Sequence, residues 1–172
     1  MESWHADASN GARPRPPAVA WLAGVAALVV GAAVPVAAQD LEAGKRVYER
    51  ANCVGCHKWH GGGGGGYGGL ALSLRDTTLD REGLIEVVRC GRPGTGMPYH
   101  ERDAYKDGGC FGLTEADLGA DMPPKGQDML RPREIEAVAD YVLAAIKGRG
   151  APTAEECAAF WGEGARQCQE TR

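Results

Sequence analysis

The residues whose types and spacing most clearly suggest chemistry are Cys53-Val54-Gly55-Cys56-His57. This C-x-x-C-H pattern is typical of covalent haem attachment. Two thiols at this spacing match the two vinyl groups of one porphyrin, and the adjacent histidine then lies beneath the iron. The motif therefore predicts one haem c attached to Cys53 and Cys56, with His57 as an axial ligand of the iron.

Two other interpretations of this cysteine pair have less support. A thioredoxin-like redox dithiol is expected beside a βαβ pattern, and the sequence has no alternating run long enough for a sheet. A structural zinc site needs a second close pair of ligands, whereas the other four cysteines are widely spaced.

Composition limits the classes of protein to consider. The 172 residues allow one domain, and 44% hydrophobic residues with 24% charged residues exclude a chain disordered by composition. The counts of 26 glycines and 2 phenylalanines suggest that something other than side chains fills part of the interior. The formal net charge of -4, with no cluster of lysine and arginine, argues against a nucleic-acid partner.

The N-terminal segment has the features of an export signal. An apolar run from Ala18 to Val34 follows Arg13 and Arg15 and leads to the small residues Val36-Ala37-Ala38. This arrangement predicts a signal peptide over residues 1–38, cleaved after Ala38. An uncleaved membrane anchor is the alternative, since ~20 apolar residues can span a bilayer. In both cases the rest of the chain is expected outside the cytoplasm.

The remaining sequence predicts helices joined by loops. Amphipathic segments predict helices over about Asp40–Ala51, Arg81–Cys90 and Arg131–Lys147, with a short helical tail after Thr153. Asp40 and Asp80 are the expected N-caps of the first two, while Pro132 and Gly148 mark the start and end of the third. The segment Gly61–Gly69 holds eight glycines, and a flexible surface loop is favoured there over a backbone pressed against a flat surface.

The chain resembles the class I mono-haem c-type cytochromes. Besides the haem motif, four segments carry the likeness: Asp40-x-x-x-Gly44-x-x-x-Tyr48, Leu84–Gly91, Gly94–Pro98 and Glu134–Val142. The resemblance implies an all-α cytochrome c fold, a small helical domain wrapped around one haem, over residues 39–150. It also implies that the first and last helices cross closely, with Gly44 permitting the approach and Tyr141 as its packing partner.

The resemblance further implies a methionine as the second axial ligand. Met97 and Met122 both precede proline, so the sequence offers two candidates. Met97 is favoured, because its glycine-rich loop has the freedom to turn a thioether onto a porphyrin. Met122 is the alternative, because only a short connector separates it from the final helix. If Met97 binds, Tyr99–Met129 is a long insert compared with many relatives.

Two further departures from the family pattern concern the proximal histidine and the extra cysteines. The proline often found after the haem motif is absent, so the sequence does not identify what supports the His57 ring. Four cysteines outside the motif allow three pairings and are expected to oxidise outside the cytoplasm. Cys90–Cys110 and Cys157–Cys168 are favoured because each closes a short loop, and the second would staple a C-terminal extension over residues 151–172.

Other candidate residues have simpler explanations. His60 and His100 could bind iron, but a lone exposed histidine is more often just solvated. Four cations are candidates for a docking surface around the haem edge, although scattered charges usually only aid solubility: Lys58, Arg75, Arg92 and Lys125. Trp59 and Trp161 are expected to pack rather than to relay electrons.

These features predict an electron carrier rather than an enzyme, because an iron held by His57 and a methionine has no open position for substrate. The expected protein is periplasmic and carries one electron between redox-protein partners. Donors of such cytochromes include quinoprotein dehydrogenases and quinol-oxidising respiratory complexes. The alternatives are a membrane-anchored or tightly bound cytochrome subunit of a larger oxidoreductase, and a haem enzyme or a gas or peroxide sensor with a labile sixth ligand. Membrane association is expected only if the leader is retained.

Overall fold

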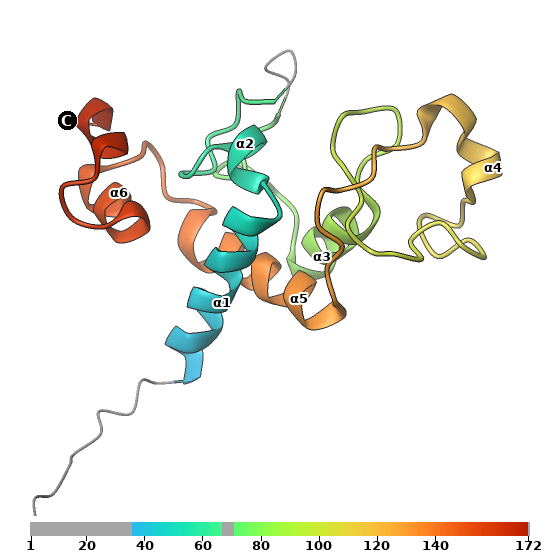
Figure 1. Ribbon diagram of the computed structural model, residues 1–172, viewed down its shortest axis with the longest axis horizontal. Helices are drawn as coiled ribbons and strands as arrows, with labels where there is room; N and C mark the ends of the chain where they lie inside the picture. The colour runs from blue at the N-terminus through green and yellow to red at the C-terminus, as the bar shows by residue number, and fades with distance from the viewer. Residues whose placement is uncertain (1–35, 67–70, 172) are drawn as a thin grey trace, which may run out of the picture. The chain divides into compact units, whose positions relative to one another are not determined.

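The computed structural model describes residues 36–66 and 71–171, so nearly all of the predicted leader lies outside the described residues (Figure 1). Six α-helices span Val36–Arg50 (α1), Cys53–His57 (α2), Arg81–Cys90 (α3), Glu115–Leu118 (α4), Pro132–Tyr141 (α5) and Ala154–Trp161 (α6). The described ranges contain no β-strand, only two isolated bridges, and the all-α prediction is confirmed. None of the helices in these ranges is long and apolar enough to cross a membrane.

The helix ends follow the predicted signals with two differences. The Asp80 carboxylate accepts a hydrogen bond from the Gly83 amide, and α3 begins at Arg81 as expected. Asp40 is not an N-cap, because α1 begins at Val36 and the helix-favouring alanines that follow continue it through Asp40. The last predicted helix changes after Tyr141 into a π-helical turn, Val142–Ile146, in which the Lys147 amide donates to the Val142 carbonyl.

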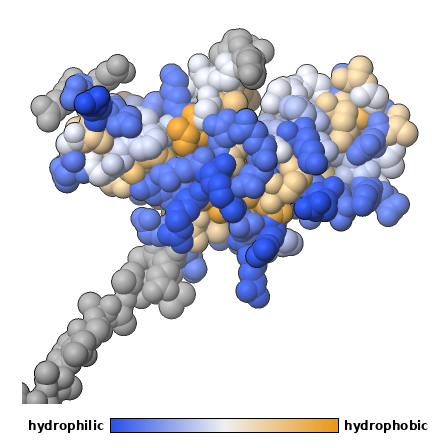
Figure 2. Space-filling view, in the orientation of Figure 1, coloured by the Kyte–Doolittle hydropathy of each residue, from blue (hydrophilic) through white to orange (hydrophobic). Residues whose placement is uncertain are grey.

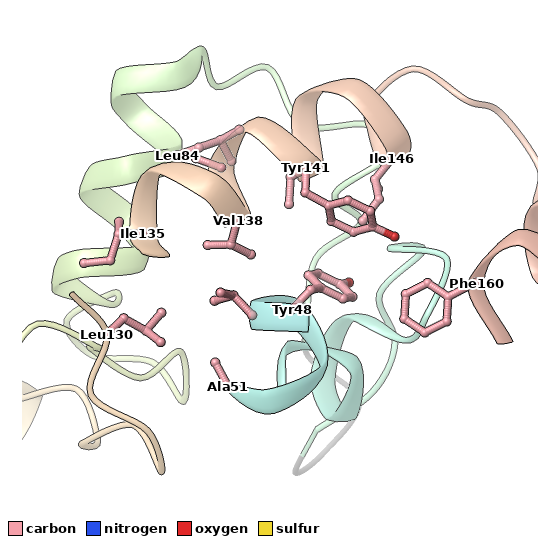
Figure 3. Close-up of a cluster of buried hydrophobic side chains, with 12 residues drawn as sticks. Tyr48, Ala51, Leu84, Leu130, Ile135, Val138, Tyr141, Ile146 and Phe160 are labelled. Atoms are coloured by element: carbon pink, nitrogen blue, oxygen red, sulfur yellow. The ribbon is translucent and has the colours of Figure 1, made fainter. Parts of the chain in front are cut away.

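The main core lies where α1 crosses α5. Buried side chains form one hydrophobic cluster, to which α1, α3, α5, the π-helical turn and α6 contribute. Nine of its members are labelled in Figure 3: Tyr48, Ala51, Leu84, Leu130, Ile135, Val138, Tyr141, Ile146 and Phe160. The Tyr48 ring packs against the rings of Tyr141 and Phe160, at centroid separations of 5.7 and 6.5 Å. This core fixes the C-terminal end of α1, from which the haem motif follows directly.

The crossing of α1 and α5 depends on the absence of a side chain at Gly44, as predicted. A Cβ atom at this position would lie 2.1 Å from the Ala137 carbonyl oxygen and 2.6 Å from the Cβ of Tyr141. Both neighbours belong to α5, so the two backbones are in direct contact here. The close approach expected from the cytochrome resemblance is therefore confirmed.

We expect Gly44→Ala to lower the free energy of unfolding. Overpacking of this kind costs ~1–3 kcal/mol, which exceeds the gain of about 0.8–1.0 kcal/mol from replacing a helical glycine by alanine. Urea unfolding measures the difference. Gly96→Ala is the matched control, because a Cβ there meets no atom within 4 Å. Equal stability of the two variants would contradict the proposed contact.

The chain after α5 is helical, in agreement with the predicted tail. Helix α6 is followed by a 3-10 segment, Arg166–Thr171, and the two are joined through Gly162 and Gly164. Both glycines have positive φ angles, 93° and 74°, which reverse the chain direction. The Cys157 and Cys168 sulfurs are bonded across this turn, with their Cα atoms 5.6 Å apart.

Candidate functional site

The residues Cys53–His57 form a separate one-turn helix, α2. The residues on each side of it, Asn52 and Lys58, have left-handed φ angles of 61° and 62°, so the backbone turns sharply into and out of the motif. A Cβ at Gly55 would lie 2.6 Å from Oδ1 of Asn52, so a larger residue there would require the Asn52 side chain to move. One helical turn thus presents both thiols and the imidazole.

The two thiols of this helix are free, whereas the other four cysteines form disulfides. Burial raises the pKa of the Cys53 thiol to about 12, so the thiol is protonated at neutral pH. A redox-active dithiol needs a depressed pKa to supply a thiolate. The pair therefore suits the attachment of a group better than disulfide exchange.

The His57 ring is oriented by a backbone carbonyl. Its Nδ1 lies 2.9 Å from the carbonyl oxygen of Leu72, which places the ring proton on Nδ1 and leaves the lone pair of Nε2 for a metal. Burial lowers the pKa of His57 and favours the neutral, ligand-competent imidazole. Leu72 therefore provides the support that the sequence did not identify.

The residue whose carbonyl orients this ring has an exposed apolar side chain. Leu72, whose carbonyl holds the ring, has a side chain that is 69% exposed. The face shown in Figure 2 is mostly hydrophilic, with small apolar areas. Two free thiols, a neutral imidazole and an uncovered leucine form a donor set and an apolar contact that fit a haem.

The first glycines of the Gly61–Gly69 segment are packed against the haem motif. The amides of Gly63 and Gly65 donate to the carbonyls of His57 and Cys56, at 3.1 and 3.0 Å. A Cβ at Gly65 would lie 2.4 Å from the Cys56 carbonyl oxygen. The favoured flexible loop is thus wrong for Gly61–Gly66, where Gly63 and Gly65 leave no room for a side chain. The following four residues lie outside the described range.

The two candidate methionines lie on neighbouring segments. The amide of Gly94 donates to the carbonyl of Asp121, and the amide of Tyr99 donates to that of Pro124, at 2.7 and 3.0 Å. Met122 packs against a small buried cluster that contains the Cys90–Cys110 disulfide, whereas Met97 belongs to no described hydrophobic cluster. Met97 as the iron ligand stays a prediction, with Met122 as the alternative.

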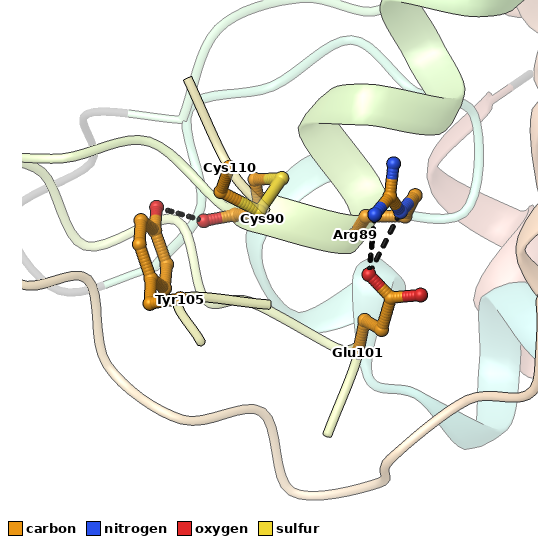
Figure 4. Close-up of a disulfide and its surroundings, with 5 residues drawn as sticks. All are labelled: Arg89, Cys90, Glu101, Tyr105 and Cys110. Carbon is orange, nitrogen blue, oxygen red and sulfur yellow. Dashed lines mark hydrogen bonds and ion pairs between the residues drawn. A yellow bond between two sulfur atoms is a disulfide. The ribbon is translucent and has the colours of Figure 1, made fainter. Parts of the chain in front are cut away.

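A second disulfide joins the end of α3 to the segment that follows Met97. Cys90, the last residue of α3, is bonded to Cys110 with a Cα separation of 5.6 Å (Figure 4). The Tyr105 hydroxyl donates to the Cys90 carbonyl, and the side chains of Arg89 and Glu101 form an ion pair at 2.7 Å. These contacts anchor the segment to the end of α3.

Several other candidate residues have structural partners. Arg75 is 6% exposed, so its proposed place on a docking surface is wrong. The other three cations are exposed and stay candidates: Lys58, Arg92 and Lys125. His100, expected to be solvated, is 2% exposed, with Nδ1 2.8 Å from the carbonyl of Asp128. Nδ1 of His60 accepts a hydrogen bond from the Gly62 amide. Two tryptophans pack against Phe160, as expected: Trp59 and Trp161.

Comparison with known proteins agrees with this geometry. Residues 39–120 match the family described as "Cytochrome C oxidase, cbb3-type, subunit III". Neither the curated proteins nor the solved structures gave a match to this chain. Among the described residues, no group of three or more histidine, cysteine, aspartate or glutamate side chains could hold a metal ion on its own.

Proposed function

We propose that this chain, a c-type cytochrome with an all-α cytochrome c fold, carries single electrons outside the cytoplasm. The haem c would have His57 and Met97 as axial ligands. The electron would pass from a dehydrogenase or a quinol-oxidising complex to an acceptor protein. The observation that carries the proposal is the hydrogen bond from Nδ1 of His57 to the Leu72 carbonyl, because it leaves Nε2 free for the iron.

Each residue of the haem motif has a separate task in this proposal. Cys53 and Cys56 attach the group, so that it is not lost outside the cell membrane. His57 would bind the iron, and Leu72 keeps its ring in a fixed orientation. The bound haem supplies a ferric–ferrous couple whose potential depends on its axial ligands and surroundings. A methionine as the second iron ligand would exclude substrates and gases.

Optical spectra with and without carbon monoxide test this proposal. In protein from a host that matures c-type cytochromes, we expect six-coordinate iron in both oxidation states and no binding of carbon monoxide by the ferrous form. Rapid carbon monoxide binding would contradict a simple carrier. It would favour a haem enzyme or a gas or peroxide sensor with a labile sixth ligand.

A second candidate function is that of a cytochrome subunit in a larger oxidoreductase. The matched family favours it, because its description names an oxidase subunit. A membrane-anchored form of this subunit differs from the free carrier in how the N-terminal segment is processed, and a tightly bound form differs in its co-purification with other redox proteins. The free carrier requires a cleaved leader, whereas an anchored subunit retains it.

We expect the mature protein to begin at Gln39 and to occur in the periplasmic fraction. N-terminal sequencing and cell fractionation give both results in one experiment. A membrane-bound protein that still contains the apolar run would identify the anchored subunit instead. Co-purification with other redox proteins would then name its partners.

A further inference from the structure

The segment that supports His57 has little intrinsic order of its own. It includes the six consecutive glycines Gly61–Gly66, and glycine loses more conformational freedom on folding than any other residue. Leu72 lies near its end and places a carbonyl oxygen 2.9 Å from Nδ1 of His57. The amides of Gly63 and Gly65 tie its first part to the haem motif, so the position of the Leu72 carbonyl depends on those bonds and on what holds the end of the segment.

Arg75, three residues beyond Leu72, holds this end. Its side chain is 5% exposed, and Nη1 donates to the carbonyl of His60 at 2.9 Å, at the start of the glycine run. Nε donates to the carbonyl of Gly150, and Nη2 donates to both carboxylate oxygens of Glu156 at 3.0 and 3.1 Å. One buried guanidinium thus joins both ends of the glycine segment to the C-terminal extension.

Glu156 is itself held in place by the extension. Its carboxylate accepts a hydrogen bond from the Thr153 amide, and its own amide donates to the Thr153 hydroxyl, which forms a capping box at the start of α6. The next residue is Cys157, which is bonded to Cys168. Phe160, further along α6, packs against Trp59, two residues after His57. The carboxylate that faces Arg75 is therefore fixed.

We propose that the C-terminal extension positions the iron ligand: Glu156, acting through Arg75, holds the Leu72 carbonyl on Nδ1 of His57. The inference rests on the proposed function in that His57 binds the iron. Arg75 and Glu156 are positioning residues and do not contact the haem in this proposal. It gives a role to residues 151–172, which lie beyond the match to the cytochrome family at residues 39–120.

The contact has a consequence for the redox potential. A hydrogen bond from Nδ1 to a carbonyl raises the basicity of the imidazole as a ligand. A more basic ligand favours the ferric iron, so a firmly held Leu72 carbonyl lowers the midpoint potential. Loosening the segment that carries Leu72 should raise the potential without removing either axial ligand.

Glu156→Gln in the full-length holoprotein tests this inference, because glutamine keeps the shape and the capping box but loses the charge. We expect amide exchange at Gly63, Gly64 and Leu74 to accelerate about tenfold or more, as for loss of a hydrogen bond to a charged group. The midpoint potential should rise, and the methionine-to-iron band should persist. Arg75→Lys keeps the charge but loses the planar fork, and it should behave in the same way.

Asp140→Asn is the matched control, because it removes one negative charge from an ion pair with Arg81 whose side chains are 43% and 40% exposed and that has no contact with Arg75 or Glu156 among those described. It should change neither amide exchange in the glycine segment nor the potential beyond a small charge effect. If Glu156→Gln fails to fold, Arg75→Lys decides the question. The inference would be overturned if amide exchange in Glu156→Gln were unchanged. It would also be overturned if exchange became faster while the midpoint potential stayed equal to that of Asp140→Asn. A protein without haem would instead refute the proposed function, while the exchange rates still test the contact.

Discussion

Replacing Cys53 and Cys56 together by alanine is expected to give a protein with no covalently bound haem. These are the free thiols of the structure, and they lie on the single helical turn that ends in His57. Without them no thioether can form, so the loss should be complete rather than partial. Intact-protein mass spectrometry should show one haem added to the wild-type chain and none added to the double variant.

Cys157→Ala combined with Cys168→Ala is the matched control for this experiment. It removes the same number of sulfur atoms, but from the disulfide that staples the C-terminal extension. This variant should keep its covalent haem. A colourless wild-type protein, with Cys53 and Cys56 both open to alkylation, would refute the haem assignment and with it the proposed electron transfer.

Met97→Ala is expected to abolish the methionine-to-ferric-iron charge-transfer band completely. The sixth coordination position then opens, the ferrous protein binds carbon monoxide, and the midpoint potential falls, because methionine ligation raises the potential of haem iron. Met97 belongs to no described hydrophobic cluster, so its truncation should affect the free energy of unfolding only through the lost bond to the iron. Optical spectroscopy, carbon monoxide titration and urea unfolding measure these effects.

Met122→Ala should show the opposite pattern. Met122 packs against the buried cluster of Cys90, Ala104, Tyr105 and Cys110. Truncation of a fully buried methionine costs at least ~2 kcal/mol, and because Met122 is only partly buried, its truncation should lower the free energy of unfolding by no more than that amount. The band, the carbon monoxide reaction and the potential should stay close to those of the wild type. Loss of the band in Met122→Ala alone would assign the ligand to Met122. Its persistence in both variants would bring His60 or His100 back into consideration.

The parts of the fold that sequence predicted well are those determined by local chemistry. Asp80 marks the start of α3 because its carboxylate caps the first turn, and Gly148 ends the last helix with a φ angle of 74°. The role of Gly44 followed from the resemblance to the c-type cytochromes, and the structure shows why a side chain does not fit where the two helices meet. In each case the side chain itself, or its absence, produces the structure.

The parts that the sequence did not reveal depend on partners without a distinctive side chain. The carbonyl that orients His57 belongs to Leu72, and any residue supplies a carbonyl. Arg75 was predicted to lie on the surface, yet its partners are mainly the carbonyls of His60 and Gly150 and the distant carboxylate of Glu156. Only tertiary structure brings these groups together, and composition carries no signal for them.

The glycine run also has a fixed length in this fold. The amides of Gly63, Gly65 and Gly66 donate to the successive carbonyls of His57, Cys56 and Gly55, so each glycine has its own partner. A run of identical residues is prone to gain or lose a codon by replication slippage. One glycine more or less before Gly63 would shift each of these partners by one position. Purifying selection should therefore act on the number of glycines in this run as strictly as on the identity of the residues in the haem motif.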